Sequence, residues 1–183
     1  MNHCGTKTIE TEHLILRAFQ LDDAGEAYRN WASDEEVTEF LTWTRHKDIS
    51  VTKQVIGEWV EQYKRSDFYQ WAIVLKEINE NIGSICVRIK NEKTNTVNIG
   101  YCIGSQWWHQ GITSEAFKAI IDFLFREVDV NRIEAKHDPN NPYSGGVMKK
   151  CGLKYEGTLR QAGYNNKGIT DECIYSLLKS EWL

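Results

Sequence analysis

The fold of this 183-residue chain is decided by one stretch, Gly104-Ser105-Gln106-Trp107-Trp108-His109-Gln110-Gly111-Ile112-Thr113-Ser114-Glu115-Ala116. Before it, apolar residues alternate as they do in a strand, at Val97, Ile99, Tyr101 and Ile103. After it, apolar residues recur at helical spacing, at Phe117, Ile121, Leu124, Phe125 and Val128. A strand, a short loop with a glycine and then a helix direct backbone N–H groups and the positive end of the helix dipole at one point. The stretch therefore predicts an anion site, and first of all a phosphate site.

Other phosphate-binding motifs are absent from the sequence. It has no Gly-x-x-x-x-Gly-Lys-[Ser/Thr], which argues against a P-loop, and no Gly-x-Gly-x-x-Gly, which argues against a dinucleotide fold. It has no His-Glu-x-x-His motif and no cysteine cluster, so we expect no metal site. His109 lies within the loop and could contact a phosphate, although an incidental exposed histidine is the simpler interpretation.

Composition narrows the class of protein. The net charge is −4 and no run of Lys and Arg occurs, so nothing indicates nucleic-acid binding. No stretch approaches 18 consecutive apolar residues, so we expect no membrane segment. The 5 cysteines are scattered and odd in number, which favours reduced thiols over disulfides. We expect a soluble, cytoplasmic protein with a single domain spanning residues 1–183.

Periodicity along the chain predicts a mixed α/β or α+β sheet. Helices are expected at about 24–31, 51–63 and 114–128, with a short one that ends at Cys151 and has Gly152 as a left-handed cap. The helix at 114–128 is long enough to cross over between two parallel strands. Strands are expected at residues 13–19, 69–76, 82–90, 96–104, 132–136, 153–160 and 169–178, with a loop at 161–168 between the last two.

One face of the strand before the loop carries only small residues, Asn98, Gly100, Cys102 and Gly104. Small residues in a strand mark a close approach by a ligand or by another backbone. An amide-containing ligand arm could pair with such a strand through main-chain hydrogen bonds. A strand packed tightly under a helix explains the pattern equally well.

Two segments resemble a known family. Trp108-His109-Gln110-Gly111-Ile112-Thr113-Ser114-Glu115-Ala116 resembles the acetyl-CoA pyrophosphate loop of the GNAT superfamily of N-acetyltransferases. The segment from Asn141-Pro142-Tyr143-Ser144 to Arg160 resembles the second half of its RimJ/RimL-type subgroup, which includes ribosomal-protein N-terminal acetyltransferases. The resemblance reaches back weakly to residues 11–17 and so covers nearly the whole chain.

The resemblance implies a GNAT fold, with a mostly antiparallel six- to seven-stranded sheet flanked by about four helices. It implies acetyl-CoA as cosubstrate and a primary amine as acceptor, with direct transfer in a ternary complex. The cofactor-binding residues would be Ile103, Gly104, His109, Gln110, Gly111, Ile112, Thr113, Ser114 and Asn141. Ser144 would lie near the thioester sulfur as a proton donor. A helix cap is the structural alternative for Asn141 and Ser144.

The chain departs from the family pattern at three positions. Trp108 stands where Gln or Arg is usual, and Thr113 where a small residue is usual. More important, Gly163 stands where the subgroup often carries the carboxylate proposed as general base. Glu39 is one substitute for that base and a water chain is another. Tyr164, Asp171 and Glu172 are better explained as solvated or structural residues.

A missing base favours an acceptor whose pKa is low. An α-amine with a pKa of about 7.7–8.0 needs only about 1–1.4 kcal/mol to be neutral at pH 7, whereas a lysine amine needs roughly 4.6 kcal/mol. We therefore expect a protein N-terminal α-amine as acceptor. A small-molecule amine and a non-catalytic acyl-CoA-binding module are the alternatives. A homodimer is one of the oligomeric states compatible with the sequence.

Overall fold

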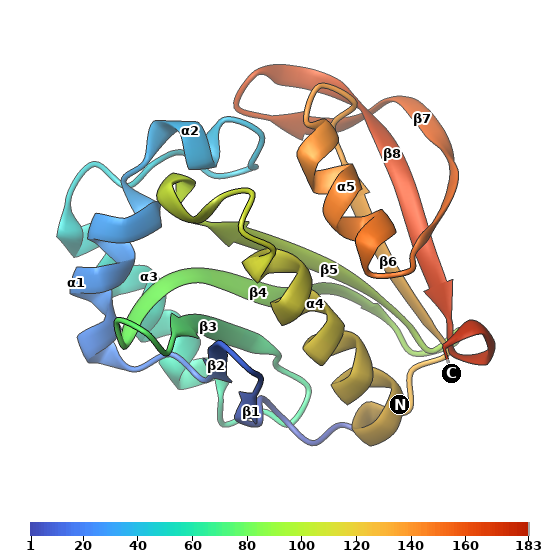
Figure 1. Ribbon diagram of the computed structural model, residues 1–183, viewed down its shortest axis with the longest axis horizontal. Helices are drawn as coiled ribbons and strands as arrows, with labels where there is room; N and C mark the ends of the chain where they lie inside the picture. The colour runs from blue at the N-terminus through green and yellow to red at the C-terminus, as the bar shows by residue number, and fades with distance from the viewer. Residues whose placement is uncertain (183) are drawn as a thin grey trace.

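The computed structural model describes residues 1–182 and shows eight strands in a single sheet, in the order β1-β2-β3-β4-β5-β6-β8-β7 (Figure 1). Every neighbouring pair is antiparallel except β5 and β6. The strands are β1 (Ile9–Glu10), β2 (Leu14–Arg17), β3 (Gln70–Leu75), β4 (Glu80–Asn91), β5 (Thr96–Ile103), β6 (Arg132–His137), β7 (Lys154–Asn165) and β8 (Gly168–Leu178).

Within residues 1–182, five α-helices accompany the sheet: α1 (Ala24–Ala27), α2 (Glu35–Thr38), α3 (Ile49–Gln62), α4 (Ile112–Phe123) and α5 (Pro142–Lys150). Short π-helical segments continue α1 and α4, namely η2 (Tyr28–Ala32) and η4 (Leu124–Val128), and 3₁₀ turns lie at η1 (Leu21–Asp23), η3 (Ser105–Trp107) and η5 (Lys179–Glu181). The mixed α/β fold class is confirmed. The sheet has one strand more than the upper limit expected. The extra strand is β1, whose two residues are too few to show the alternation of apolar and polar residues.

The apolar residues form one core on each face of the sheet. The larger core lies under α4 and α5, where Phe117, Ile120 and Met148 meet Trp71 and Ile85. The smaller core lies on the opposite face under α1, η2 and α3, where Trp31 and Ile56 pack on Ala72 and Val74. Figure 1 shows α4 and α5 on one side of the sheet and α3 on the other. The two faces of β5 therefore have different neighbours.

The final hairpin differs from the expectation. Residues 161–165 belong to β7 rather than to a loop, so the turn between Asn165 and Gly168 is short. A bulge between Leu159 and Gly163, with Gln161 at φ 52°, interrupts the alternation and conceals the strand from a periodicity analysis. At the end of α5, Gly152 has φ 87°, which confirms the predicted left-handed cap.

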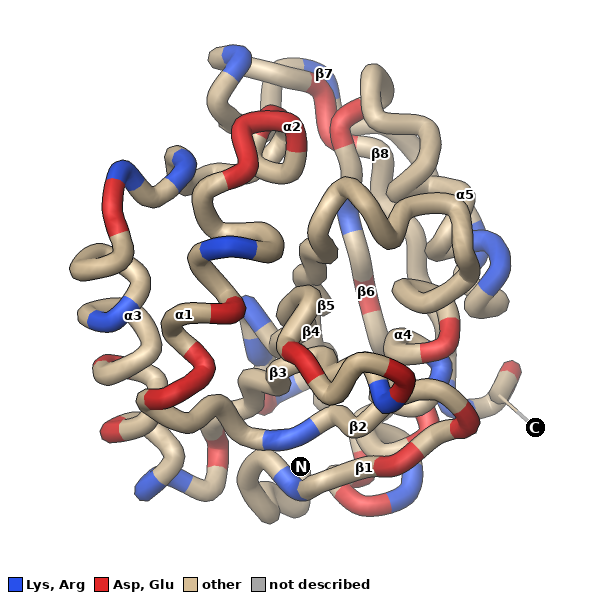
Figure 2. The backbone as a smooth tube through the Cα atoms, turned by 60° about the vertical axis from the view of Figure 1, so that its left-hand side comes forward, with Lys and Arg blue, Asp and Glu red and all other residues tan. Residues whose placement is uncertain are grey.

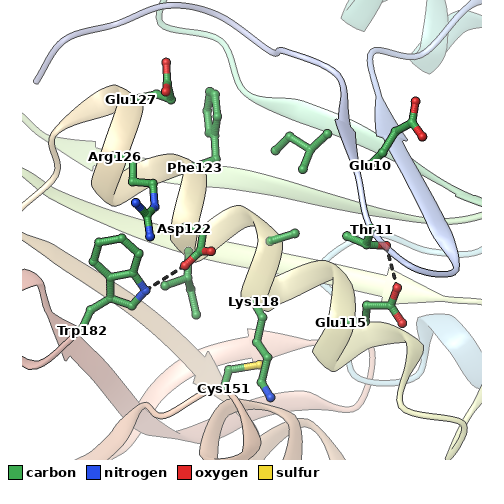
Figure 3. Close-up of a pocket in the computed structure, with 13 residues that line it drawn as sticks. Glu10, Thr11, Glu115, Lys118, Asp122, Phe123, Arg126, Glu127, Cys151 and Trp182 are labelled. Atoms are coloured by element: carbon green, nitrogen blue, oxygen red, sulfur yellow. Dashed lines mark hydrogen bonds between the residues drawn. The ribbon is translucent and has the colours of Figure 1, made fainter.

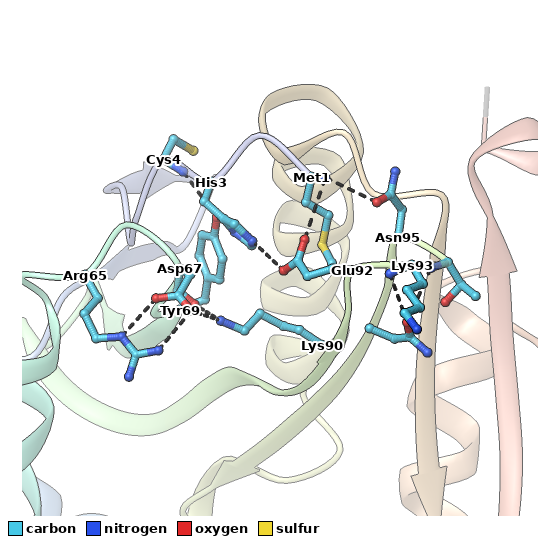
Figure 4. Close-up of polar contacts among 12 residues, drawn as sticks. Met1, His3, Cys4, Arg65, Asp67, Tyr69, Lys90, Glu92, Lys93 and Asn95 are labelled. Atoms are coloured by element: carbon cyan, nitrogen blue, oxygen red, sulfur yellow. Dashed lines mark hydrogen bonds and ion pairs between the residues drawn. The ribbon is translucent and has the colours of Figure 1, made fainter.

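Polar contacts hold the N-terminal segment against the ends of β4 and β5 (Figure 4). The Met1 ammonium donates to Asn95 at 3.2 Å, and the His3 ring bonds Tyr69 at 3.0 Å and Glu92 at 2.8 Å. These bonds connect the first residues to the turn that precedes β5.

Candidate active site

The loop after β5 presents unpaired backbone donors, as expected. Gly111 caps α4 with φ 82°, a conformation in which a side chain would be strained. The N–H groups of the first helical turn have no acceptor inside a helix, and no side chain caps this end. Because α4 begins two residues earlier than the expected Ser114, Ile112 and Thr113 belong to that first turn.

A cation lies beside this helix end. The Nζ of Lys150 is 3.6 Å from the position that a Cβ on Gly111 would occupy, and Lys150 makes no ion pair within residues 1–182. Lys150 comes from the last turn of α5, and Figure 2 shows basic residues at that end of the helix. Sequence reasoning missed this residue, because only the packing of α5 on α4 brings it to the loop.

The other loop residues are held by local contacts. The His109 ring packs edge-on against Tyr143 of α5, with 4.6 Å between centroids. The Gln110 side chain donates to the carbonyl of Gln106 at 3.0 Å. Ile112 and Ser114 are buried, so only their backbone groups face the loop. The loop is therefore fixed to α5 as well as to α4.

Next to the loop, β5 and β6 separate. They pair only from Thr96 to Ile99, with Ile99 opposite Ala135, while β5 continues to Ile103 and β6 to His137. Gly104 N–H bonds to Ile82 of β4, so alternation turns the backbone groups of Tyr101 and Ile103 toward the opening. The Ile103 carbonyl is already taken, because the Trp108 indole donates to it at 2.9 Å. The free edge is therefore centred on Tyr101 and the N–H of Ile103.

The first turn of α5 lies over this opening. The Tyr101 hydroxyl lies 3.0 Å from both Oγ and the carbonyl oxygen of Ser144, and burial raises the pKa of Tyr101. Asn141 caps α5 by accepting the N–H of Ser144 at 3.4 Å. On the other wall, the Nε2 of His137 is buried and has no hydrogen-bond partner in the described part of the chain. A Cβ on Gly145 of α5 would lie 2.5 Å from this nitrogen, so α5 covers it.

The two glycines of the segment 98–104 are needed for different reasons. A Cβ on Gly104 would lie 2.2 Å from the carbonyl oxygen of Asn30, so this glycine is needed for packing against η2. A Cβ on Gly100 would lie 2.4 Å from Cδ of Arg88, whose side chain crosses the strand there. Gly104 therefore fits the interpretation of a strand packed under a helix.

The Glu39 carboxylate is paired with a lysine. It accepts from Lys167 at 2.6 Å, in the turn between β7 and β8. Glu39 follows α2, which Figure 2 shows as an acidic segment, with Glu35 and Glu36 in its first turn. Gly163 lies in β7 opposite Thr170, on the same hairpin.

Two of the cysteines are poor nucleophiles in this structure. Burial raises the pKa of Cys86 to about 11 and that of Cys102 to about 12, so both thiols stay protonated near neutral pH. Among residues 1–182, no group of three or more His, Cys, Asp or Glu side chains could hold a metal ion. Within the same residues, no helix has the length and apolar content to cross a membrane.

Two open hollows lie elsewhere. One, of ≈ 680 Å³, follows α4 between β1 and Trp182, with Lys118 and Cys151 side by side (Figure 3). The other, of ≈ 880 Å³, follows the bulge of β7 and Asp171. Neither is lined by a residue that the sequence predicted to bind the cofactor.

Comparison with known proteins agrees with this geometry. A family model described as an acetyltransferase (GNAT) domain matches residues 13–154. The chain is 32% identical to the uncharacterized N-acetyltransferase p20 of Bacillus licheniformis, over 96% of this chain and 98% of that protein. It is 29% identical to the ribosomal protein uS5-alanine N-acetyltransferase of Escherichia coli, over 46% of this chain and 43% of that protein.

A solved structure shares the fold. RimL, a ribosomal L7/L12 α-N-protein acetyltransferase in complex with coenzyme A, superposes with a TM-score of 0.84 and 20% identity, over 94% of this chain and 98% of that one. The family model covers most of the chain, and the p20 relative covers nearly all of it. This chain therefore belongs to the GNAT family of acetyl-CoA-dependent N-acetyltransferases.

Proposed function

We propose that this enzyme acetylates the α-amine at a protein N-terminus. The relatives supply the first support, since one is named for a ribosomal-protein alanine and a structural neighbour for an α-N-protein acceptor. The observation that carries the proposal is the acidic segment from Asp34 to Glu39, which contacts the β7–β8 turn. Such a segment attracts a cationic chain end. This acceptor would place the reaction in the cytoplasm, where ribosomal proteins are made.

The residues of the opening fit acetyl-CoA, which supplies the activated acetyl group. In the proposed complex the first turn of α4, with His109, Gln110 and Gly111 before it, holds the pyrophosphate through backbone N–H groups, and Lys150 adds a charge. The free edge of β5 pairs with the pantetheine amides, with Ile103 contributing its N–H. Asn141 bonds the cofactor in addition to capping α5.

Proton donation at the sulfur is assigned to Ser144. Its hydroxyl and that of Tyr101 are 3.0 Å apart, so Tyr101 holds the Ser144 hydroxyl in place. Glu39 is the candidate for the base that the sequence offers, and Lys167 holds one oxygen of its carboxylate.

An amine panel tests the proposal. Thiol release from acetyl-CoA is measured with an Ala-initiated peptide, a Ser-initiated peptide, an N-terminally blocked lysine peptide, spermidine and free amino acids. The highest kcat/KM is expected for the two free N-termini, with acetylation located on the α-amine by mass spectrometry. A higher kcat/KM for spermidine or an amino acid would establish the small-molecule alternative. Tight acetyl-CoA binding with no turnover on any amine would establish the non-catalytic module.

A further inference from the structure

A glycine is required at position 163, because the Glu172 side chain fills the space that a side chain there would need. A Cβ built on Gly163 would lie 2.7 Å from Cγ and 3.1 Å from Oε1 of Glu172. Glu172 is in β8, diagonally across the ladder from Gly163, which pairs with Thr170. The position where the sequence showed no carboxylate is therefore covered by a carboxylate from the neighbouring strand.

The carboxylate of Glu172 is held in place with one oxygen free. Its Oε2 accepts from Lys136 Nζ at 2.9 Å, and the two side chains are 24% and 32% exposed. Its Oε1 makes no hydrogen bond with any residue from 1 to 182. An ion pair that fixes one oxygen leaves the other available to accept a proton.

Lys136 is on β6, which borders the opening, and Glu172 is on β8, the next strand, both on the face opposite α4 and α5. Ala135, the last residue of β6 that pairs with β5, points into the α4 core, so Lys136 points to the other face. The same alternation in β8 places Tyr175 in the core and Glu172 on Lys136's face. Gly100, the first residue of β5 beyond the ladder, faces the same side, where the Arg88 side chain covers it.

The direction of attack follows from these positions. The phosphate loop and α5 lie on the core side of the opening, so the cofactor reaches it from there. An acceptor amine must then approach from the opposite face, the one that carries Lys136 and Glu172.

We propose that Glu172 is the general base, supplied from β8 in place of a residue at 163, and that Lys136 positions it. The inference rests on the proposed acetyl transfer to an amine. Glu172 Oε1 takes one proton from the acceptor ammonium, directly or through one water, and later returns it to solvent. The neutral nitrogen forms the N–C bond as the C–S bond breaks, and the sulfur takes the C–S electron pair. Ser144 gives a proton to this thiolate and regains one from the acylated nitrogen, so both charges are neutralised.

The decisive experiment compares Glu172→Gln with Glu134→Gln. Glu134 is a matched control, since it is 27% exposed, lies on the same sheet face and pairs with Arg132 at 2.8 Å. With the best amine of the panel at pH 7, Glu172→Gln should lower kcat/KM about 10²-fold and Glu134→Gln less than about twofold. The defect should shrink as pH rises past the amine pKa, because the amine then arrives neutral. Acetyl-CoA affinity, measured by calorimetry, should stay within about twofold of wild type.

A variant with the carboxylate moved from β8 to β7 distinguishes loss of the base from a disturbance of the fold. Glu172→Ala removes the group and opens the space, and the double variant Gly163→Glu/Glu172→Ala offers a carboxylate from β7 instead. The kcat/KM of the double variant should be at least about tenfold higher than that of Glu172→Ala.

The outcomes distinguish this inference from the function on which it depends. If wild type turns over no amine, the proposed function and the base both fail. If wild type is active but Glu172→Gln matches it, or shows a defect that is constant with pH, only the assignment of Glu172 is overturned.

Discussion

At the scale of the residue, Lys150 contributes a charge where the cofactor phosphates are expected. Its Nζ lies beside Gly111 and has no acidic partner among residues 1–182. Lys150→Met should weaken coenzyme A binding about two- to fivefold at low ionic strength, the range expected for an exposed charge pair. The loss should diminish with added salt. Calorimetry measures both affinities.

Lys53→Met provides the comparison, because Lys53 is exposed on α3, on the other face of the sheet. Its coenzyme A affinity should equal that of wild type. Equal affinities for Lys150→Met and wild type at low salt would remove Lys150 from the site.

The loop could be anticipated from the sequence, but its neighbours could not. Gly111 and the periodicity after it predict a helix N-terminus, since both signals are local. The sequence marks Trp108 only as an unusual residue, because its bond to Ile103 depends on a turn that periodicity does not describe. The sequence favours a structural role for Glu172, because its proximity to Gly163 follows from the register of a bulged hairpin.

At the scale of the element, α5 begins at a capped turn whose cap has a second proposed role. Asn141 accepts the N–H of Ser144, and loss of such a cap costs about 1 kcal/mol. Asn141→Ala should lower the unfolding free energy by about that amount, whereas Asn141→Ser should retain it because serine also caps. Urea unfolding measures this difference. If Asn141 binds the cofactor as well, Asn141→Ser should weaken coenzyme A binding while stability stays at the wild-type level.

The turn between β7 and β8 holds the segment that follows α2. The Asn166 side chain donates to the carbonyls of Thr38 at 2.7 Å and Trp43 at 2.8 Å, and its N–H donates to Leu41 at 3.1 Å. Asn166→Ala should cost about 1–2 kcal/mol, because two carbonyls lose their donor. Hydrogen exchange should accelerate at residues 38–43, as mass spectrometry of the exchanged peptides would show.

Lys167→Ala removes a neighbouring contact and tests the specificity of this effect. Its ion pair with Glu39 is about half exposed, with side-chain exposures of 54% and 44%, and should contribute less than about 1 kcal/mol. Unchanged exchange at residues 38–43 in Asn166→Ala would show that the turn does not hold the segment.

At the scale of the whole molecule, one topological event creates the site. A parallel pair needs a crossover connection, and α4 provides it between β5 and β6. The same crossover sets a helix N-terminus at the end of β5, where the two strands part. The sequence indicated this crossover through the length of the helix at 114–128. It could not indicate that the ladder ends at Ile99, because that depends on α5 packing over the opening.

The three strands beyond the opening depend on charge pairs on their helix-free face, and this makes stability sensitive to acid. Hydrogen bonds from Arg132, and then from Ser176, lower the pKa of Glu156 to about 2 from an ordinary value of 4.5. A carboxylate whose pKa is lower in the folded state stabilises the fold above pH 4.5 and loses that contribution as pH falls toward 2. In wild type, the unfolding free energy from urea titrations should therefore fall more between pH 6 and pH 3 than in Glu156→Gln, so the two curves converge. Glu77→Gln, at an exposed position with no ion pair within residues 1–182, should instead follow wild type in parallel. A constant difference between wild type and Glu156→Gln over this range would show that Glu156 acts through packing rather than through its charge.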